Sequence, residues 1–151
     1  ILKGIATAED AAMCVEIGVD GVYISNHGGR QLDHGRGSID VLPEVVEAVG
    51  GKAAVIVDGA INRGTDIVKA MALGADAVGI GRMQGYGLAA NGKDGVVRVL
   101  ELLEEEIQIA FGLLGVSSFA ELNSSYITPA PAVNLPHVTS AFPLIDLQHR
   151  Y

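Results

Sequence analysis

Two stretches of this chain repeat one another and restrict the fold to a wound α/β array. Residues 17–24 (IGVDGVYI) and residues 73–80 (LGADAVGI) carry a glycine, an aspartate and an apolar run at equivalent positions, 56 residues apart. Each stretch has the form of a helix end, a glycine turn and a short buried strand. The spacing accommodates two βα units of about 28 residues each. The repeat fits a barrel as well as another wound α/β fold, and it does not choose between them.

The rest of the pattern continues this alternation along the chain. Short apolar runs predict strands at residues 1–5, 21–25, 53–58 and 76–80. Helical patterns occur from Thr7, near residues 42–49 and over residues 64–73. Thr7 followed by Asp10 indicates a capped helix start. Strands that alternate with helices favour βαβ units and a parallel sheet, which makes this an α/β protein.

The C-terminal third has a different character. After Gly95, apolar residues recur at helical spacing and predict a long amphipathic helix, with Glu101, Glu104 and Glu105 on its solvated side. Ser118 and Glu121 indicate a further capping box. Residues 128–151 contain four prolines, so we divide the chain into a folded part, residues 1–127, and an extended tail, residues 128–151. The tail is apolar enough that we expect it to pack on a neighbouring subunit.

Composition excludes several classes of partner. The chain is 49% hydrophobic and 19% charged, which is typical of a globular protein, and its net charge of −8 disfavours nucleic acid and anionic membranes. One cysteine, Cys14, allows no internal disulfide and no Cys-rich zinc site, so we expect no metal and interpret Cys14 as a buried apolar residue. No apolar run approaches the roughly 20 residues of a membrane helix. We expect a cytoplasmic protein.

Residues 25–31 (SNHGGRQ) follow directly on the strand at 21–25 and bring two reactive groups together. His27 can accept a proton at neutral pH, because the reference pKa of imidazole is about 6.5. Arg30 stays charged and can bind a carboxylate through two parallel hydrogen bonds. The pair therefore indicates chemistry on a small acid. The alternative is structural, with His27 bonded to its loop and Arg30 paired with Asp33.

This motif resembles the active-site signature of the FMN-dependent 2-hydroxy-acid oxidases and dehydrogenases, a family that includes glycolate, lactate and mandelate enzymes. The resemblance begins at the strand that carries Lys3 and continues through Gly81 and Arg82. It implies a (β/α)8 TIM barrel, which takes about 250 residues. Since this chain has 151 residues and begins at Ile1 without a methionine, we expect it to be the C-terminal half, strands 5 to 8, with the long helix and the tail. The N-terminal half of the barrel is then a required partner.

Two glycine-containing loops resemble the phosphate end of such a barrel. They are residues 58–66 (DGAINRGTD) and 79–82 (GIGR), and each alone is also typical of a tight βα turn. In (β/α)8 barrels a phosphate commonly binds at the loops after strands 7 and 8. The resemblance implies that the cofactor, FMN, is bound by Lys3, Ser25, Asp58, Gly59, Asn62, Arg63, Gly81 and Arg82. Gly81 and Arg82 would hold the phosphate, Asp58 the ribityl hydroxyls, and Lys3 the N1 and C2-oxygen edge of the flavin.

One position departs from the family pattern. The family usually reads Asp-Gly-Gly-Val-Arg-Arg-Gly, whereas this chain has Asn62 in place of the first arginine and keeps the second as Arg63. An amide can donate a hydrogen bond to a phosphate, but it adds no positive charge.

The activity implied by the resemblance is oxidation of an L-2-hydroxy acid to the 2-oxo acid. His27 would be the general base and Arg30 would bind the substrate carboxylate, in a homo-oligomer of four or eight subunits. Two alternatives stay open: another FMN- or phosphate-binding barrel enzyme, and a non-catalytic half-barrel that completes a partner chain. The particular acid, the electron acceptor, and the choice between hydride transfer and a carbanion are not encoded in these motifs.

Overall fold

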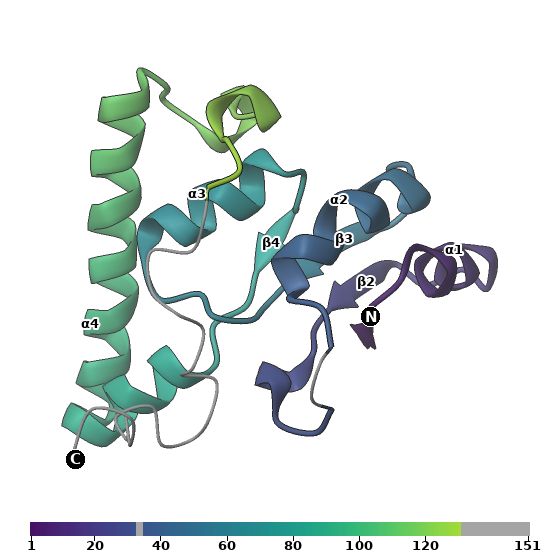
Figure 1. The fold of residues 1–151 in the computed structure, drawn as a ribbon. Helices are drawn as coiled ribbons and strands as arrows, with labels where there is room; N and C mark the ends of the chain where they lie inside the picture. The colour runs from purple at the N-terminus through teal and green to yellow at the C-terminus, as the bar shows by residue number, and fades with distance from the viewer. Residues whose placement is uncertain (33–34, 131–151) are drawn as a thin grey trace, which may run out of the picture.

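The computed structural model describes residues 1–32 and 35–130. It contains a four-stranded parallel sheet with the strand order β1-β2-β3-β4. The strands are β1 (Leu2–Ile5), β2 (Gly21–Ile24), β3 (Ala54–Val57) and β4 (Ala77–Val78). The helices are α1 (Ala8–Glu16), α2 (Ser38–Val49), α3 (Gly64–Ala72) and α4 (Arg82–Leu114), with 3-10 turns η1 (His27–Gly29), η2 (Phe119–Glu121) and η3 (Ser124–Tyr126) (Figure 1). The predicted α/β fold with a parallel sheet is confirmed.

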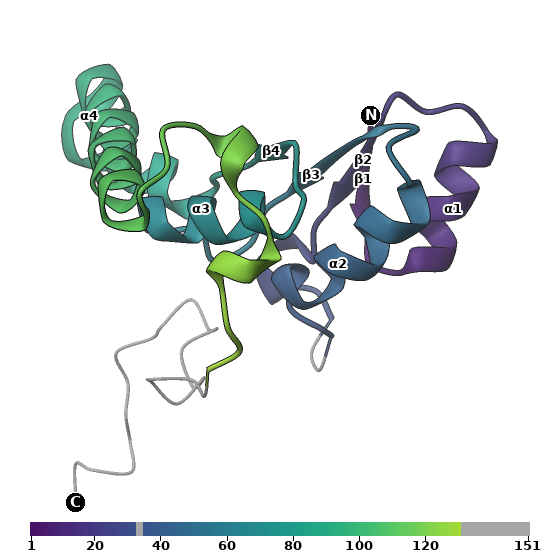
Figure 2. The same ribbon diagram turned by 90° about the horizontal axis from the view of Figure 1, so that it is seen from above.

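Helices α1 and α2 pack against one face of this sheet, as the view from above shows (Figure 2). Val22 and Ile24 of β2 and Val55 and Val57 of β3 point toward the helices and are almost fully buried. The residues of α2 that meet them are spaced for one helical face. They are Val41, Leu42, Val45 and Val49, each at most 2% exposed. Because side chains alternate along a strand, the residues between these valines and isoleucines face the other side of the sheet.

The internal repeat of the sequence corresponds to two equivalent helix ends. Ile17 ends α1 and Leu73 ends α3 with the same backbone angles, φ −84° and ψ 0°. The glycines that follow, Gly18 and Gly74, have φ of 79° and 98°, a region that residues with a Cβ rarely adopt. Both ends are closed in the same way, by an N–H to C=O hydrogen bond of 3.1 Å spanning five residues. The predicted glycine stops are confirmed.

Thr7 caps α1 as predicted, since its hydroxyl oxygen accepts a hydrogen bond of 3.1 Å from the Asp10 N–H.

The predicted bounds of two elements, α2 and β4, were wrong. Helix α2 begins at Ser38, one turn before the predicted start near residue 42, and contains Pro43 in its interior. Strand β4 is limited to Ala77–Val78, much shorter than the predicted residues 76–80.

The long helix predicted after Gly95 is present, but the structure adds a helical segment before it. Helix α4 begins at Arg82, and it is divided at Asn91 and Gly92, whose backbone is not helical. The two parts approach so closely that a Cβ on Gly87 would lie 2.6 Å from the Gly95 carbonyl oxygen. Glycines at these positions are therefore required for the bend, which the helical periodicity after Gly95 does not reveal.

The C-terminal part of the described chain packs on α4. Phe111 and Phe119 form an edge-to-face pair with ring centroids 5.0 Å apart. The expected capping box takes another form: the Glu121 carboxylate accepts hydrogen bonds from the backbone and hydroxyl of Ser117 and from the Ser118 hydroxyl, around the 3-10 turn η2. The predicted tail lies mostly outside the described residues, from 131 onward. Within residues 1–32 and 35–130, no helix combines the length and apolar character needed to cross a membrane.

Candidate functional site

The predicted site residues follow the carboxyl ends of the parallel strands, which lie at one edge of the sheet. His27 and Arg30 come after β2, Asp58 and Gly59 after β3, and Gly81 and Arg82 after β4. Lys3 belongs to β1 itself. Four segments that are distant in the sequence thus contribute to the same region.

Lys3 joins three of these segments. Its ammonium nitrogen donates a hydrogen bond of 2.7 Å to Ser25 Oγ and lies 3.0 Å from Asp58 Oδ2. Ser25 is buried, at 5% exposure, whereas the Lys3 side chain keeps 46% of its surface. Three predicted cofactor ligands therefore form one polar cluster, and its cation stays accessible to a ligand.

Tyr23 belongs to this cluster and was missed in the sequence, where it was interpreted only as part of a buried strand. The Lys3 ammonium lies 4.8 Å from the centroid of the Tyr23 ring. Burial, followed by the charge of Asp58 and hydrogen bonding to it, raises the pKa of the Tyr23 phenol. Strand alternation could have found this residue, because Tyr23 and Ser25 are two positions apart and share a face.

The loop after β2 presents His27 and Arg30 at the surface. His27 has φ of 56°, in the left-handed region, and its backbone N–H donates a hydrogen bond of 3.1 Å to Ser25 Oγ. Gly28 and Gly29 continue the turn with φ of 70° and 69°. Within the described part of the chain, neither the imidazole of His27 nor the guanidinium of Arg30 has a hydrogen bond to protein. Both are exposed, and Ser25 connects their loop to Lys3.

Arg82 lies against the same loop. A Cβ built on Gly28 would be 3.6 Å from Arg82 Nη2, so the guanidinium of the first residue of α4 contacts the turn that carries His27. Gly81 precedes it as the N-terminal flanking residue of α4, and a Cβ there would meet nothing within 4 Å. The start of α4 therefore offers an exposed cation beside backbone N–H groups, a favourable environment for a phosphate.

Gly59 turns the chain after Asp58 with φ of 110°. A Cβ on Gly59 would lie 3.0 Å from Ser38 Oγ and 3.8 Å from Asn26 Oδ1. Both oxygens are buried, and neither has a hydrogen-bond partner within residues 1–32 and 35–130. Buried polar atoms of this kind normally have a partner, so this edge of the sheet has the capacity to bind a polar ligand.

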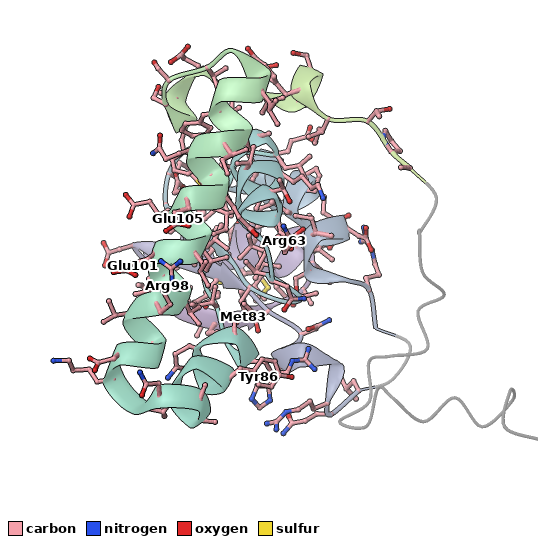
Figure 3. The ribbon with its side chains drawn as sticks, turned by 90° about the vertical axis from the view of Figure 1, so that its left-hand side faces the viewer. Arg63, Met83, Tyr86, Arg98, Glu101 and Glu105 are labelled. Carbon is pink, nitrogen blue, oxygen red and sulfur yellow. The ribbon has the colours of Figure 1, made fainter. Side chains whose placement is uncertain are left out.

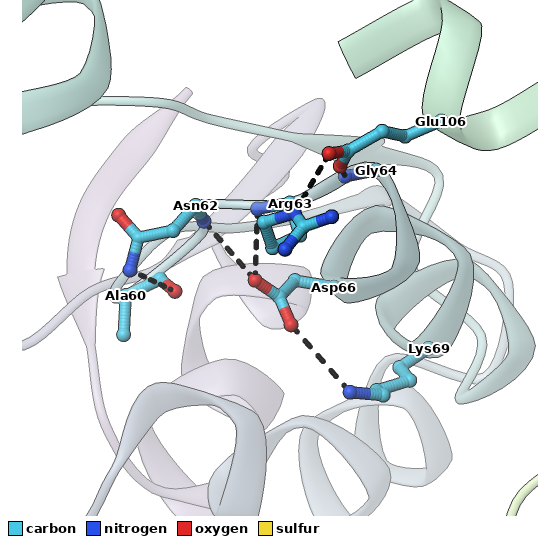
Figure 4. A network of polar contacts seen from close by, with 7 residues as sticks. All are labelled: Ala60, Asn62, Arg63, Gly64, Asp66, Lys69 and Glu106. Atoms are coloured by element: carbon cyan, nitrogen blue, oxygen red, sulfur yellow. Dashed lines mark hydrogen bonds and ion pairs between the residues drawn. The ribbon is translucent and has the colours of Figure 1, made fainter. Parts of the chain in front are cut away.

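Asn62 and Arg63 are not brought into the Lys3 cluster. The Asn62 amide donates a hydrogen bond of 3.2 Å to the Ala60 carbonyl, and the N–H groups of both residues donate to Asp66 Oδ2 (Figure 4). Arg63 Nε donates to Glu106 Oε1 of α4 at 2.7 Å. These contacts order the loop before α3 and attach it to α4.

A second group of charges lies on the outer side of α4. Arg98 Nη1 is 3.1 Å from Glu101 Oε2 and 2.9 Å from Glu105 Oε1, and these side chains point away from the sheet (Figure 3). The hydrogen bonds that Arg98 donates to Glu105 and Glu101 raise the pKa of Arg98. This group is exposed and shares no residue with the motif loops.

In the part of the chain that the structure describes, no three His, Cys, Asp or Glu side chains lie together as metal ligands.

Comparison with proteins of known sequence gives consistent results. The chain is 50% identical over 127 residues to an L-lactate oxidase from Nostoc sp. and, over the same length, to a peroxisomal (S)-2-hydroxyacid oxidase from Arabidopsis thaliana. It is 47% identical over 131 residues to 2-hydroxyacid oxidase 1 of Mus musculus. Each alignment covers 84–87% of this chain and 35% of the relative, so the chain spans about a third of these relatives' length.

Solved structures agree with this result. A mandelate oxidase mutant with a monooxide FMN adduct superimposes with a TM-score of 0.76 at 51% identity, covering 79% of this chain and 38% of that one. A monotopic membrane protein, (S)-mandelate dehydrogenase, gives 0.79 at 46% identity, covering 82% and 33%. The family model that matches residues 1–129 is that of FMN-dependent dehydrogenase, which confirms the predicted resemblance and FMN as the cofactor. With the motif loops gathered at one edge of a parallel sheet, and with these matches, the chain belongs to the FMN-dependent dehydrogenase family.

Proposed function

We propose that this chain supplies the catalytic half of an enzyme that oxidises a small L-2-hydroxy acid to the 2-oxo acid with FMN. One observation carries the proposal: Ser25 Oγ accepts hydrogen bonds from both Lys3 Nζ and the His27 N–H, at 2.7 and 3.1 Å. The residue expected at the flavin edge and the loop expected to hold the base are thus attached to one buried hydroxyl. The names of the relatives, which include lactate, mandelate and 2-hydroxyacid oxidases, support the same substrate class.

The residues present fit FMN. Lys3 offers a positive charge to the flavin edge, Arg82 and the N–H groups after Gly81 suit a phosphate, and Asp58 and Ser25 can bond to hydroxyls. Gly59 lies beside the two buried oxygens that have no hydrogen-bond partner among the described residues. Asn62 would contribute an amide, and Arg63 has its two Nη groups available beyond its Nε bond to Glu106. FMN, when bound, accepts the two electrons that leave the substrate.

In this proposal Arg30 binds the substrate carboxylate and orients the molecule. Its guanidinium is exposed and can form two parallel hydrogen bonds with a carboxylate. His27, three residues earlier, accepts the proton that the substrate loses. The left-handed backbone at His27, and the bond from its N–H to Ser25, hold the imidazole at the end of β2. The chain thereby provides a base and an anion clamp on one short loop.

The chain would form strands 5 to 8 of a (β/α)8 barrel. Its strands are parallel and follow one another in sequence order, as in a barrel, whereas a doubly wound sheet reverses its strand order at one point. Within the described residues, β1 and β4 each pair on one side only. An N-terminal half would complete the barrel and the active site, in a homo-oligomer. The cytoplasmic location stays a prediction, since several relatives are named as peroxisomal and one similar structure as a monotopic membrane protein.

The test is the visible absorption spectrum of the purified protein, as isolated, before and after anaerobic addition of L-2-hydroxy acids. We expect a flavin band that bleaches with at least one of glycolate, lactate or mandelate. A flavin band that persists with every acid would contradict the proposed reaction and favour another FMN barrel enzyme. Complete absence of flavin would favour a non-catalytic half-barrel.

A further inference from the structure

The face of the sheet opposite the helices carries one aromatic side chain among its charges. Tyr23 lies on the same strand face as Ser25, next to the Lys3–Asp58 pair. Its hydroxyl lies close to Gly79, just after β4, where a Cβ would overlap the hydroxyl and lie 3.3 Å from Asp58 Cβ. The absence of a side chain at Gly79 therefore leaves room for the phenol beside Asp58. No role of this pair follows from the motifs.

The Tyr23 ring and hydroxyl reach the two ends of the Lys3–Asp58 pair. The ammonium of Lys3 lies 4.8 Å from the ring centroid, within the distance at which a cation is attracted to an aromatic face. The hydroxyl lies at Gly79, beside Asp58, whose Oδ2 is 3.0 Å from Lys3 Nζ. The ring thus favours the observed position of the ammonium, and the hydroxyl lies beside Asp58, the anion that partly neutralises Lys3.

We propose that Tyr23 is a positioning residue that sets how much positive charge Lys3 presents to the cofactor. A phenol that donates a hydrogen bond to Asp58 takes up part of the negative potential of this carboxylate, and Lys3 is then neutralised less. The inference rests on the proposed function, because Lys3 is expected at the flavin edge. It goes beyond that function in assigning Tyr23 and Gly79 to the electrostatics of the site.

The protonation state of Tyr23 supports this role. Burial and the carboxylate of Asp58 raise the pKa of the phenol, so that it stays protonated and able to donate throughout the neutral range. The charged groups that face it are Lys3 and Asp58. Lys3 lies over the ring, and Gly79 leaves room for the hydroxyl beside Asp58.

The test compares the flavin midpoint potential of the wild-type holoprotein with that of Tyr23→Phe, measured by reduction with dithionite against a reference dye. The phenylalanine keeps the ring and removes the hydroxyl. Reduced flavin accumulates negative charge at the edge expected next to Lys3, so we expect the potential to fall. Equivalently, the affinity for reduced FMN should fall by roughly three- to tenfold more than the affinity for oxidised FMN. The control is Tyr126→Phe on η3, a phenol outside this cluster, which should leave the potential unchanged.

A double-mutant cycle separates positioning from general loss of structure. Tyr23→Phe in a Lys3→Met background should produce little further change, because the effect of the hydroxyl passes through Lys3. An equal shift in both backgrounds, or an unchanged potential in Tyr23→Phe, would overturn the inference. Because the reductant is chemical, this result is independent of the substrate. A wild-type flavin that no 2-hydroxy acid reduces would contradict the proposed function and leave the assignment of Tyr23 to be decided by the potentials.

Discussion

Arg63 and Glu106 lie 43 residues apart in the sequence and form a hydrogen bond, which Arg63 Nε donates to Glu106 Oε1 at 2.7 Å. The second oxygen of this carboxylate accepts a hydrogen bond of 2.6 Å from the Gly64 N–H at the start of α3. One side chain of α4 therefore caps a neighbouring helix and binds the residue that precedes it (Figure 4). The loop after β3 is attached to α4 by this contact.

The Glu106 contact predicts a dependence of stability on acid pH. The Gly64 N–H first, and then Arg63, lower the pKa of Glu106 from its usual 4.5. A carboxyl group whose pKa is lowered by folding stabilises the fold at pH values above its unfolded-state pKa. This contribution disappears as the pH falls through the lowered pKa of the folded state. Glu106→Gln should thus lower the thermal midpoint at pH 7 by more than at pH 3.5. Glu104→Gln, an exposed position on the same helix, is the control, and an equal effect of both would contradict the prediction.

Gly64 is expected to tolerate no side chain. A Cβ there would lie 2.7 Å from both the Ile107 nitrogen and the Leu103 carbonyl oxygen, which are backbone atoms that cannot rotate away. Gly64→Ala should destabilise the protein by about 1–3 kcal/mol through overpacking between α3 and α4. Gly112→Ala on α4 meets nothing within 4 Å and should be neutral or stabilising by up to about 1 kcal/mol. Chemical denaturation of both variants measures the difference, and similar values for the two would disprove the clash.

Ala60 is expected to be a strained position. Its φ of 55° lies in the left-handed region, which costs a residue with a Cβ about 1–2 kcal/mol. Ala60→Gly should therefore stabilise the holoprotein by roughly 1 kcal/mol. The conformational entropy that glycine adds to the unfolded chain reduces this gain. Ala89→Gly, at an exposed position within α4, should instead destabilise by a similar amount. A lower unfolding midpoint in Ala60→Gly would contradict the assignment of strain.

His27 and Arg30 are expected to affect different steps. His27→Asn should slow the reduction of bound flavin by the substrate by roughly 10²–10⁴-fold and leave FMN binding intact, because the base is lost. Arg30→Lys should chiefly weaken substrate binding, since a lysine cannot form the two parallel bonds. Stopped-flow reduction at several acid concentrations separates the limiting rate from the apparent dissociation constant. Equal loss of FMN from both variants would indicate that the two residues are structural.

The boundaries that sequence reasoning could predict depend on local chemistry. Thr7 caps α1 because its hydroxyl reaches the Asp10 N–H three residues later, and Gly18 and Gly74 end helices because their φ is positive. Each of these interactions is complete within a few residues. The start of α2 and the bend of α4 were not predictable in this way, since no side chain caps the start of α2 and the Gly87–Gly95 approach joins two separate helical segments.

The sequence by itself determined the alternation of strands and helices, the parallel sheet, the motif with His27 and Arg30, and the family. The alternation and the sheet follow from periodicity, the reactive pair from residue types at short spacing, and the family from the resemblance of the motifs. Only the tertiary structure decided that Lys3, Tyr23, Ser25 and Asp58 form one cluster and that Arg63 binds Glu106. The physical reason is that a side chain contacts the groups that folding brings close to it. The separation of two residues along the chain does not reveal which groups these are.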